Sequence, residues 1–140
     1  MIFKDACHCG TIGIEFETAT DPAATDVRAC QCSFCRKHNA LAVSDPDGKI
    51  TIRIRAASRL SRYEFGLRTA TYVVCAQCGV YVASITNDGS SRAIAIVTAL
   101  DDAARFTRPP RPVDYDSETR ADRLLRRQRR WTPATLIMDD

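Results

Sequence analysis

The spacing of the cysteines constrains this chain more than any other feature of its sequence. Seven cysteines occur in 140 residues, and an odd number cannot pair completely into disulfides within one chain. They form three groups: Cys7-x-Cys9, Cys30-x-Cys32-x-x-Cys35 and Cys75-x-x-Cys78. Sulfurs brought together on such tight turns suit tetrahedral zinc, with Zn–S distances of ~2.3 Å. The spacing favours zinc over disulfides, and over a redox role for the last pair, because no βαβ pattern surrounds it.

Glycines separate the cysteines into a group of four and a group of three. Gly10 follows Cys9 and Gly79 follows Cys78, and glycine readily adopts the positive φ of a turn that closes around sulfur. The outer pairs therefore predict one closed, structural zinc site, and the middle group predicts a second zinc with an open, catalytic position. The predicted ligands are Cys7, Cys9, Cys75 and Cys78 at the structural zinc, and Cys30, Cys32 and Cys35 at the second zinc. We expect two zinc ions per chain, the second of which is lost if its thiolates oxidise.

Alternating apolar and polar residues predict β-strands over most of the chain. The alternation is clean over residues 11–17 and 50–55, and further strand patterns cover residues 70–74, 80–85 and 92–98. Short strands at this spacing are typical of antiparallel sheets rather than of parallel βαβ units. We therefore predict a mainly β fold of antiparallel sheets, which the structural zinc would staple together.

The composition changes after Leu100. Residues 105–112 hold three prolines and three arginines and are expected to run as an extended connection. Asp116 or Ser117 is then expected to cap a short C-terminal helix that ends near Arg130. The apolar side of this helix is predicted to comprise Ala121, Leu124, Leu125 and Trp131.

Length and composition predict a single domain over residues 1–140, with a core over residues 4–100 and a proline- and arginine-rich extension over residues 101–140. No apolar run approaches the ~18–20 residues that cross a bilayer. The first residues lack the pattern of a secretory leader, so we expect a cytoplasmic protein that does not bind membranes. Unpaired edge strands would allow a homodimer.

The charge balance argues against a polyanionic partner. The net charge is +3, from 20 basic and 17 acidic residues. Six arginines between Arg120 and Arg130 are the one signal for nucleic acid, yet residues 101–140 carry nine arginines against eight acidic groups. We interpret these arginines as the solvated face of a terminal helix, and nucleic acid is not an expected partner.

The three cysteine groups, in this order and at these separations, resemble the glutathione-dependent formaldehyde-activating enzyme family, which includes centromere protein V. The resemblance covers residues 4–100 and is carried by Cys7-His8-Cys9-Gly10, Cys30-Gln31-Cys32-Ser33-Phe34-Cys35-Arg36-Lys37 and Cys75-Ala76-Gln77-Cys78-Gly79. It implies a β-tent fold of antiparallel sheets with the same division into structural and catalytic zinc. It also implies a carbon–sulfur lyase-type reaction that joins formaldehyde to glutathione.

The ligand set of the second site predicts the kind of chemistry. Three thiolates would leave zinc with a net negative charge, which makes it a poor Lewis acid. Soft sulfur ligands instead favour a thiol as the fourth ligand, held as thiolate at neutral pH. We therefore expect an enzyme in which a small thiol such as glutathione adds to a small carbonyl such as formaldehyde.

Three residues that follow the middle group are candidates for further roles. Arg36 and Lys37 directly follow Cys35 and either bind a substrate carboxylate or remain in solvent. His38 lies three residues beyond Cys35. It could be a fourth zinc ligand, could transfer a proton during thiol addition as a catalytic residue beside the three cysteines, or could have neither role.

Two other functions compete with this hypothesis. A non-enzymatic zinc module would bind nucleic acid or another acidic partner through its arginine-rich C-terminal helix. Zinc-hydroxide hydrolysis of a small imine or amide would need a glutamate base, but Glu64 and Glu118 lie far from the middle group in sequence.

Overall fold

The alternating strands near the N-terminus form a buried part of the sheet. The computed structural model describes residues 1–139. Strand β2 (Ile12–Glu17) pairs antiparallel with β1 (Ile2–Ala6) on one side and with β5 (Lys49–Ile54) on the other. The three isoleucines of β5 are fully buried, because alternate side chains of a strand share one face.

Most of the remaining sheet is also antiparallel. Its strands are β3 (Arg28–Cys30), β4 (Ala42–Val43), β6 (Leu60–Tyr63), β7 (Ala70–Cys75), β8 (Tyr81–Thr86) and β9 (Arg92–Ile96). The pairs β6–β7, β7–β8 and β8–β9 are antiparallel, and β4 connects β9 to β3. Small and branched side chains from β7, β8 and β9 pack into the same core as β2 and β5. The predicted mainly β fold is confirmed.

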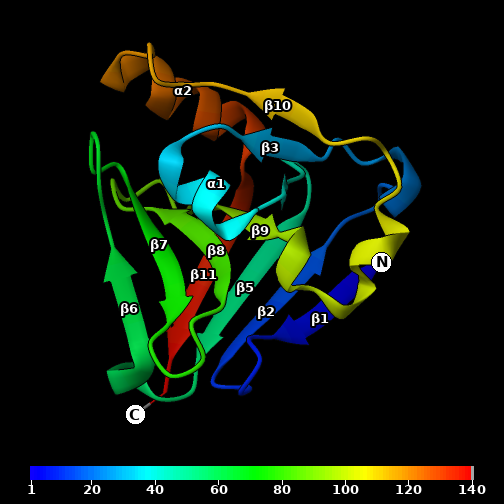
Figure 1. Ribbon diagram of the computed structural model, residues 1–140, viewed down its shortest axis with the longest axis vertical. Coiled ribbons are helices and arrows are strands. Elements are labelled where there is room, and N and C mark those ends of the chain that lie inside the picture. The colour runs from blue at the N-terminus through cyan, green and yellow to red at the C-terminus, as the bar shows by residue number, and fades with distance from the viewer. Residues whose placement is uncertain (140) are drawn as a thin grey trace.

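Two strand pairs are parallel, which the sequence analysis did not predict. Strand β11 (Thr132–Met138) runs parallel to β5 and pairs antiparallel with β9, so it lies between them within the sheet (Figure 1, red). Strand β10 (Arg111–Val113) runs parallel to β3. The sheet is therefore mixed. Residues 132–138 lack a clean alternation, so their strand conformation depends on partners that lie far away in sequence.

Two helices lie at the same end of the molecule as β3 and β10. Helix α1 (Ser33–His38) follows β3, and α2 (Arg120–Arg130) precedes β11 (Figure 1). The helix near the C-terminus was predicted, whereas α1 was not. Neither helix in the described part of the chain is long and apolar enough to cross a membrane.

The start of α2 differs from the prediction. The Thr119 hydroxyl caps the helix by accepting a hydrogen bond from the Asp122 amide at 3.1 Å, in place of Asp116 or Ser117. The physical reason is positional: a cap accepts from an amide in the first helical turn, and that turn begins at Arg120.

The buried face of α2 also differs from the predicted apolar side. Trp131 is buried as expected, but Ala121 and Leu125 are exposed, and the buried residue of the helix is Arg127. Arg127 lies over the Trp131 ring at 4.5 Å and donates to the Thr69 hydroxyl at 2.6 Å. The surface that α2 covers thus offers polar partners, so arginines rather than leucines turn towards it.

Candidate metal centres

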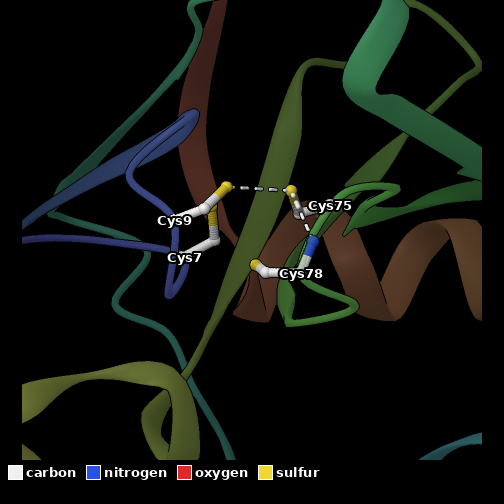
Figure 2. A group of neighbouring side chains, drawn as sticks. All are labelled: Cys7, Cys9, Cys75 and Cys78. Atoms are coloured by element: carbon white, nitrogen blue, oxygen red, sulfur yellow. Dashed lines mark hydrogen bonds between the residues drawn. The ribbon is translucent and has the colours of Figure 1, made fainter.

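Two hairpin turns bring four cysteines together. Cys7 and Cys9 lie between β1 and β2, whereas Cys75 ends β7 and Cys78 lies in the turn to β8 (Figure 2). All four Sγ atoms lie within 4.8 Å of one another, and the Cys7–Cys9 and Cys9–Cys75 pairs are 3.8 and 3.6 Å apart. A zinc ion ~2.3 Å from four tetrahedral sulfurs requires sulfurs about 3.8 Å apart. This four-sulfur cluster therefore fits zinc.

The two turns that carry these cysteines are built alike. Gly10 and Gly79 adopt φ values of +86° and +81°. The Gly10 amide donates to the Cys7 carbonyl at 3.0 Å, and the Gly79 amide donates to the Cys75 carbonyl at 2.8 Å. Glycine is needed at both positions because residues with a Cβ rarely adopt positive φ.

Neighbouring groups shape the acidity of these thiols. The Thr11 hydroxyl lies 3.2 Å from the Cys9 sulfur and lowers the pKa of Cys9 to about 6. Burial raises the pKa of Cys7 to about 11, although the Ile12 amide donates to its sulfur at 3.3 Å. Zinc binds cysteine as thiolate and displaces the proton, so the affinity of this cluster for zinc would depend on pH.

The other three cysteines form a second cluster where β3 meets α1. Cys30 ends β3, Cys32 caps α1 and Cys35 lies within the helix, with all three Sγ atoms within 4.8 Å of one another. The Cys35 amide donates to the Cys32 sulfur at 3.3 Å. Hydrogen bonds from Cys30 and Cys35 hold the pKa of Cys32 well below its usual range, while hydrogen bonds to Cys30 and Cys32 raise that of Cys35. This three-sulfur cluster could hold a metal ion through three ligands.

The two clusters differ in their surroundings. The three-sulfur cluster lines a cavity of about 400 Å³, and no cysteine of the four-sulfur cluster does. The other walls of this central cavity come from residues 65–70, from β7, β8 and β9, and from α2. Small-molecule sites have volumes of ~300–1,000 Å³. The three-sulfur cluster therefore faces a space that a small ligand could fill.

Only one of the three residues predicted after the middle group reaches this cavity. Arg36 lines it, with its Nε donating to the Gln31 carbonyl at 3.0 Å. Lys37 and His38 are exposed and do not line it. The His38 ring packs against the Phe34 ring in a tilted arrangement, with 4.5 Å between centroids. The group of three sulfurs includes neither nitrogen of His38. The functional roles of these residues stay predictions.

The strands β7 and β8 place two tyrosines at the cavity, Tyr72 and Tyr81, for which no function was predicted from the sequence. Tyr81 is 4% exposed, and its hydroxyl has no hydrogen-bond partner among residues 1–139. Burial raises the pKa of Tyr81 well above its usual range, so it is protonated at neutral pH. Their regular spacing along the strands is visible in the sequence, but it does not show which face meets a cavity.

Three arginines of α2 line the cavity: Arg123, Arg126 and Arg127. Arg129 and Arg130 are exposed, so the interpretation of the arginines as a solvated face holds for them. It does not hold for Arg123, Arg126 and Arg127, because α2 covers the cavity and presents these side chains to it. The expectation that nucleic acid is not a partner of α2 stays a prediction.

These features define a class of small, mainly β protein with a mixed sheet and two cysteine clusters. The four-cysteine cluster is a complete ligand set, the three-cysteine cluster opens to a cavity, and each could hold a metal ion. The chain belongs to the glutathione-dependent formaldehyde-activating enzyme family, whose sequence model matches residues 2–114. The predicted family resemblance is thus confirmed. The match ends before α2 and β11.

The chain is also similar to a solved structure. A Rhodobacter sphaeroides protein of known crystal structure is 31% identical to this chain, with a TM-score of 0.53. The alignment covers 78% of this chain and 97% of that chain. The comparison with curated proteins gives no match.

Proposed function

We propose that this protein is a zinc-dependent enzyme of carbon–sulfur bond chemistry, which joins a small thiol such as glutathione to a small carbonyl such as formaldehyde. The observation that carries this proposal is the position of the three-sulfur cluster on a cavity of about 400 Å³. Membership of the glutathione-dependent formaldehyde-activating enzyme family supports the same reaction class.

The donor sets assign a different role to each cluster. Cys7, Cys9, Cys75 and Cys78 would hold a structural zinc, because four sulfurs complete a tetrahedron. Cys30, Cys32 and Cys35 would hold a second zinc with one position left for substrate. Zinc among soft sulfur ligands would keep a substrate thiol deprotonated at neutral pH.

The reaction needs no reactant besides the thiol and the carbonyl. A sulfur lone pair forms the new C–S bond, the carbonyl π electrons move to oxygen, and that oxygen gains the proton that the thiol has lost. The reverse reaction breaks the C–S bond and returns the proton. The protein therefore has to place sulfur against the carbonyl carbon and to offer the carbonyl oxygen a hydrogen-bond donor.

We assign this donor role to Tyr81, which lines the cavity. Its hydroxyl is buried, is protonated at neutral pH and lacks a hydrogen-bond partner among the described residues. Arg36, also at the cavity, stays the predicted contact for a substrate carboxylate. Lys37 and His38, assigned to substrate binding and catalysis in the same proposal, would have to act from outside the cavity.

Replacing Tyr81 with phenylalanine should lower the catalysed rate and leave the protein at least as stable. Loss of one donor to a developing oxyanion costs about 10²-fold or more in kcat. Removal of a buried hydroxyl without a partner should raise the free energy of unfolding by about 1 kcal/mol. Steady-state kinetics and denaturant unfolding measure the two effects. Tyr63→Phe is the matched control, since Tyr63 is 49% exposed and lies outside the cavity.

Zinc content tests the proposed function directly. We expect about two zinc ions per chain in protein purified anaerobically without a chelating tag, because both sulfur clusters fit the metal. Elemental analysis after a challenge with chelator should show that glutathione protects one of the two ions. One zinc per chain, unaffected by glutathione, together with no acceleration of glutathione addition to formaldehyde, would contradict the proposal.

A further inference from the structure

The central cavity has a basic wall that the proposed reaction does not use. Three arginines come from α2, and Arg28 comes from β3. The acidic residue that lines the cavity is Asp116. An excess of positive charge around an enclosed space calls for an anionic ligand unless each arginine already has a carboxylate partner.

Two of these arginines do have such a partner. Glu118 accepts hydrogen bonds from Arg126 at 2.8 and 3.0 Å and from Arg123 at 3.3 Å. Arg126 also lies over the Tyr115 ring at 3.6 Å, and Arg123 donates to the Tyr115 carbonyl at 2.7 Å. These contacts hold both side chains in place, and the Glu118 carboxylate neutralises part of their positive charge.

Arg127 forms no ion pair with a carboxylate of residues 1–139. It is 6% exposed. Its hydrogen bond to Thr69 at 2.6 Å and its stacking on Trp131 position the guanidinium but do not neutralise it. Its Nε has no hydrogen-bond partner in the described part of the chain. Burial lowers the pKa of Arg127 only to about 10, so the side chain remains charged at neutral pH.

The charge of Arg28 is only partly compensated. Its side chain is 13% exposed, and its Nη2 donates to the Ser44 hydroxyl at 2.7 Å. The nearest carboxylate, Asp26, lies 3.9 Å away and already accepts two hydrogen bonds from Arg111, at 2.8 and 3.2 Å. Arg28 therefore shares the Asp26 carboxylate with Arg111, which lies closer to it.

We propose that Arg127 and Arg28, which line the same cavity, are the residues that bind a carboxylate of the small thiol taken into it. The thiol part rests on the proposed function, whereas the carboxylate subsite does not require a metal. A guanidinium presents paired N–H donors that match a carboxylate, which suits it to this role. Because the family match ends at residue 114, the subsite residue Arg127 belongs to the segment beyond that match.

The volume of the cavity limits what carries the carboxylate. About 400 Å³ is near the lower end of the range for small-molecule sites, so the anion belongs to a small ligand and not to a polymer. The three-sulfur cluster and Arg127 line the same cavity, so one molecule can present its sulfur to the first and its carboxylate to the second.

Three probes separate the two ends of such a ligand in calorimetric titrations of the zinc-loaded protein. Glutathione has both a thiol and carboxylates, S-methylglutathione has the carboxylates alone, and glutathione dimethyl ester has the thiol alone. We expect the ester to bind about 10- to 100-fold more weakly than glutathione, since a charge-assisted hydrogen bond is lost. Arg127→Met should weaken glutathione and S-methylglutathione by a similar factor and leave the ester unchanged.

Arg129→Met is the matched control, because it removes the same charge from an exposed position of the same helix. It should bind all three probes like the wild type. Wild-type affinity of Arg127→Met for glutathione, or failure of both carboxylate probes to bind, would overturn the subsite. Arg127-dependent binding of S-methylglutathione without any catalysed addition to formaldehyde would uphold the subsite and remove the proposed function.

Thermal unfolding distinguishes a ligand-binding arginine from a structural one. A buried charge without a carboxylate partner is costly, so Arg127→Met should melt no lower than the wild type. A lower melting temperature combined with unchanged binding of glutathione would make Arg127 a structural residue and overturn the proposal.

Discussion

Replacing Cys75 with serine is expected to leave the protein largely unfolded at 37 °C. Cys75 is fully buried, and its sulfur lies 3.6 Å from that of Cys9, which is 66 positions away in sequence. A structural zinc contributes ~10–16 kcal/mol in zinc-finger peptides, whereas whole domains are stable by only ~5–15 kcal/mol. Losing a structural zinc from the four-sulfur cluster would therefore remove about as much free energy as stabilises the whole fold. Circular dichroism melting and zinc content together measure the effect.

Cys35→Ser is the matched control for this prediction. It makes the same change of one atom at another buried cysteine, which is 7% exposed and belongs to the other cluster. It should retain a cooperative melting transition, because the four-sulfur cluster is untouched. If Cys75→Ser instead melted at the wild-type temperature, the four-sulfur cluster would not be structural.

Cys35→Ser is also expected to abolish the catalysed addition of glutathione to formaldehyde. Cys35 is one of three sulfurs that line the central cavity, and its loss would leave two ligands for the proposed second zinc. That metal would supply several kcal/mol of barrier reduction, so the catalysed rate should fall about 10³-fold or more. The measured quantity is the rate of adduct formation in excess of the uncatalysed reaction, with zinc content determined on the same sample.

The zinc content should fall from about two ions to about one in Cys35→Ser, since only the four-sulfur cluster remains complete. The two serine variants then separate folding from catalysis within one chain. Full activity of Cys35→Ser with two zinc ions bound would place the chemistry away from the three-sulfur cluster and refute the proposed reaction.

Local sequence determined the division of the sulfurs into four and three. Each outer pair lies on a turn of a few residues, closed by Gly10 or Gly79 at positive φ. Such a turn depends on near neighbours alone, so cysteine spacing and one glycine are enough to predict it. The alternating segments 11–17 and 50–55 likewise predicted β2 and β5, because side-chain alternation is a property of the strand itself.

Local sequence was insufficient for α1 and β11. A helix of six residues leaves only a weak periodic pattern, and its cap is the Cys32 sulfur rather than one of the usual cap residues. Residues 132–138 form β11 because they pair with β5 on one side and with β9 on the other. Sequence resemblance likewise extended only to about residue 100, and the family match to residue 114.

Tertiary structure alone decided which side chains line the central cavity. Leu125 and Arg127 are two positions apart on α2, yet the leucine is 45% exposed and the arginine 6%. Hydropathy predicts instead that the leucine is buried and the arginine exposed. Arg127, however, donates a hydrogen bond to the Thr69 hydroxyl, which is 58 positions away. Cysteine spacing thus identified the cysteines of each sulfur cluster, because each turn that carries them is local, whereas the meeting of Cys9 with Cys75 across 66 positions depends on the tertiary fold. The arginine wall and the buried Tyr81 depend on long-range packing, which no local pattern records.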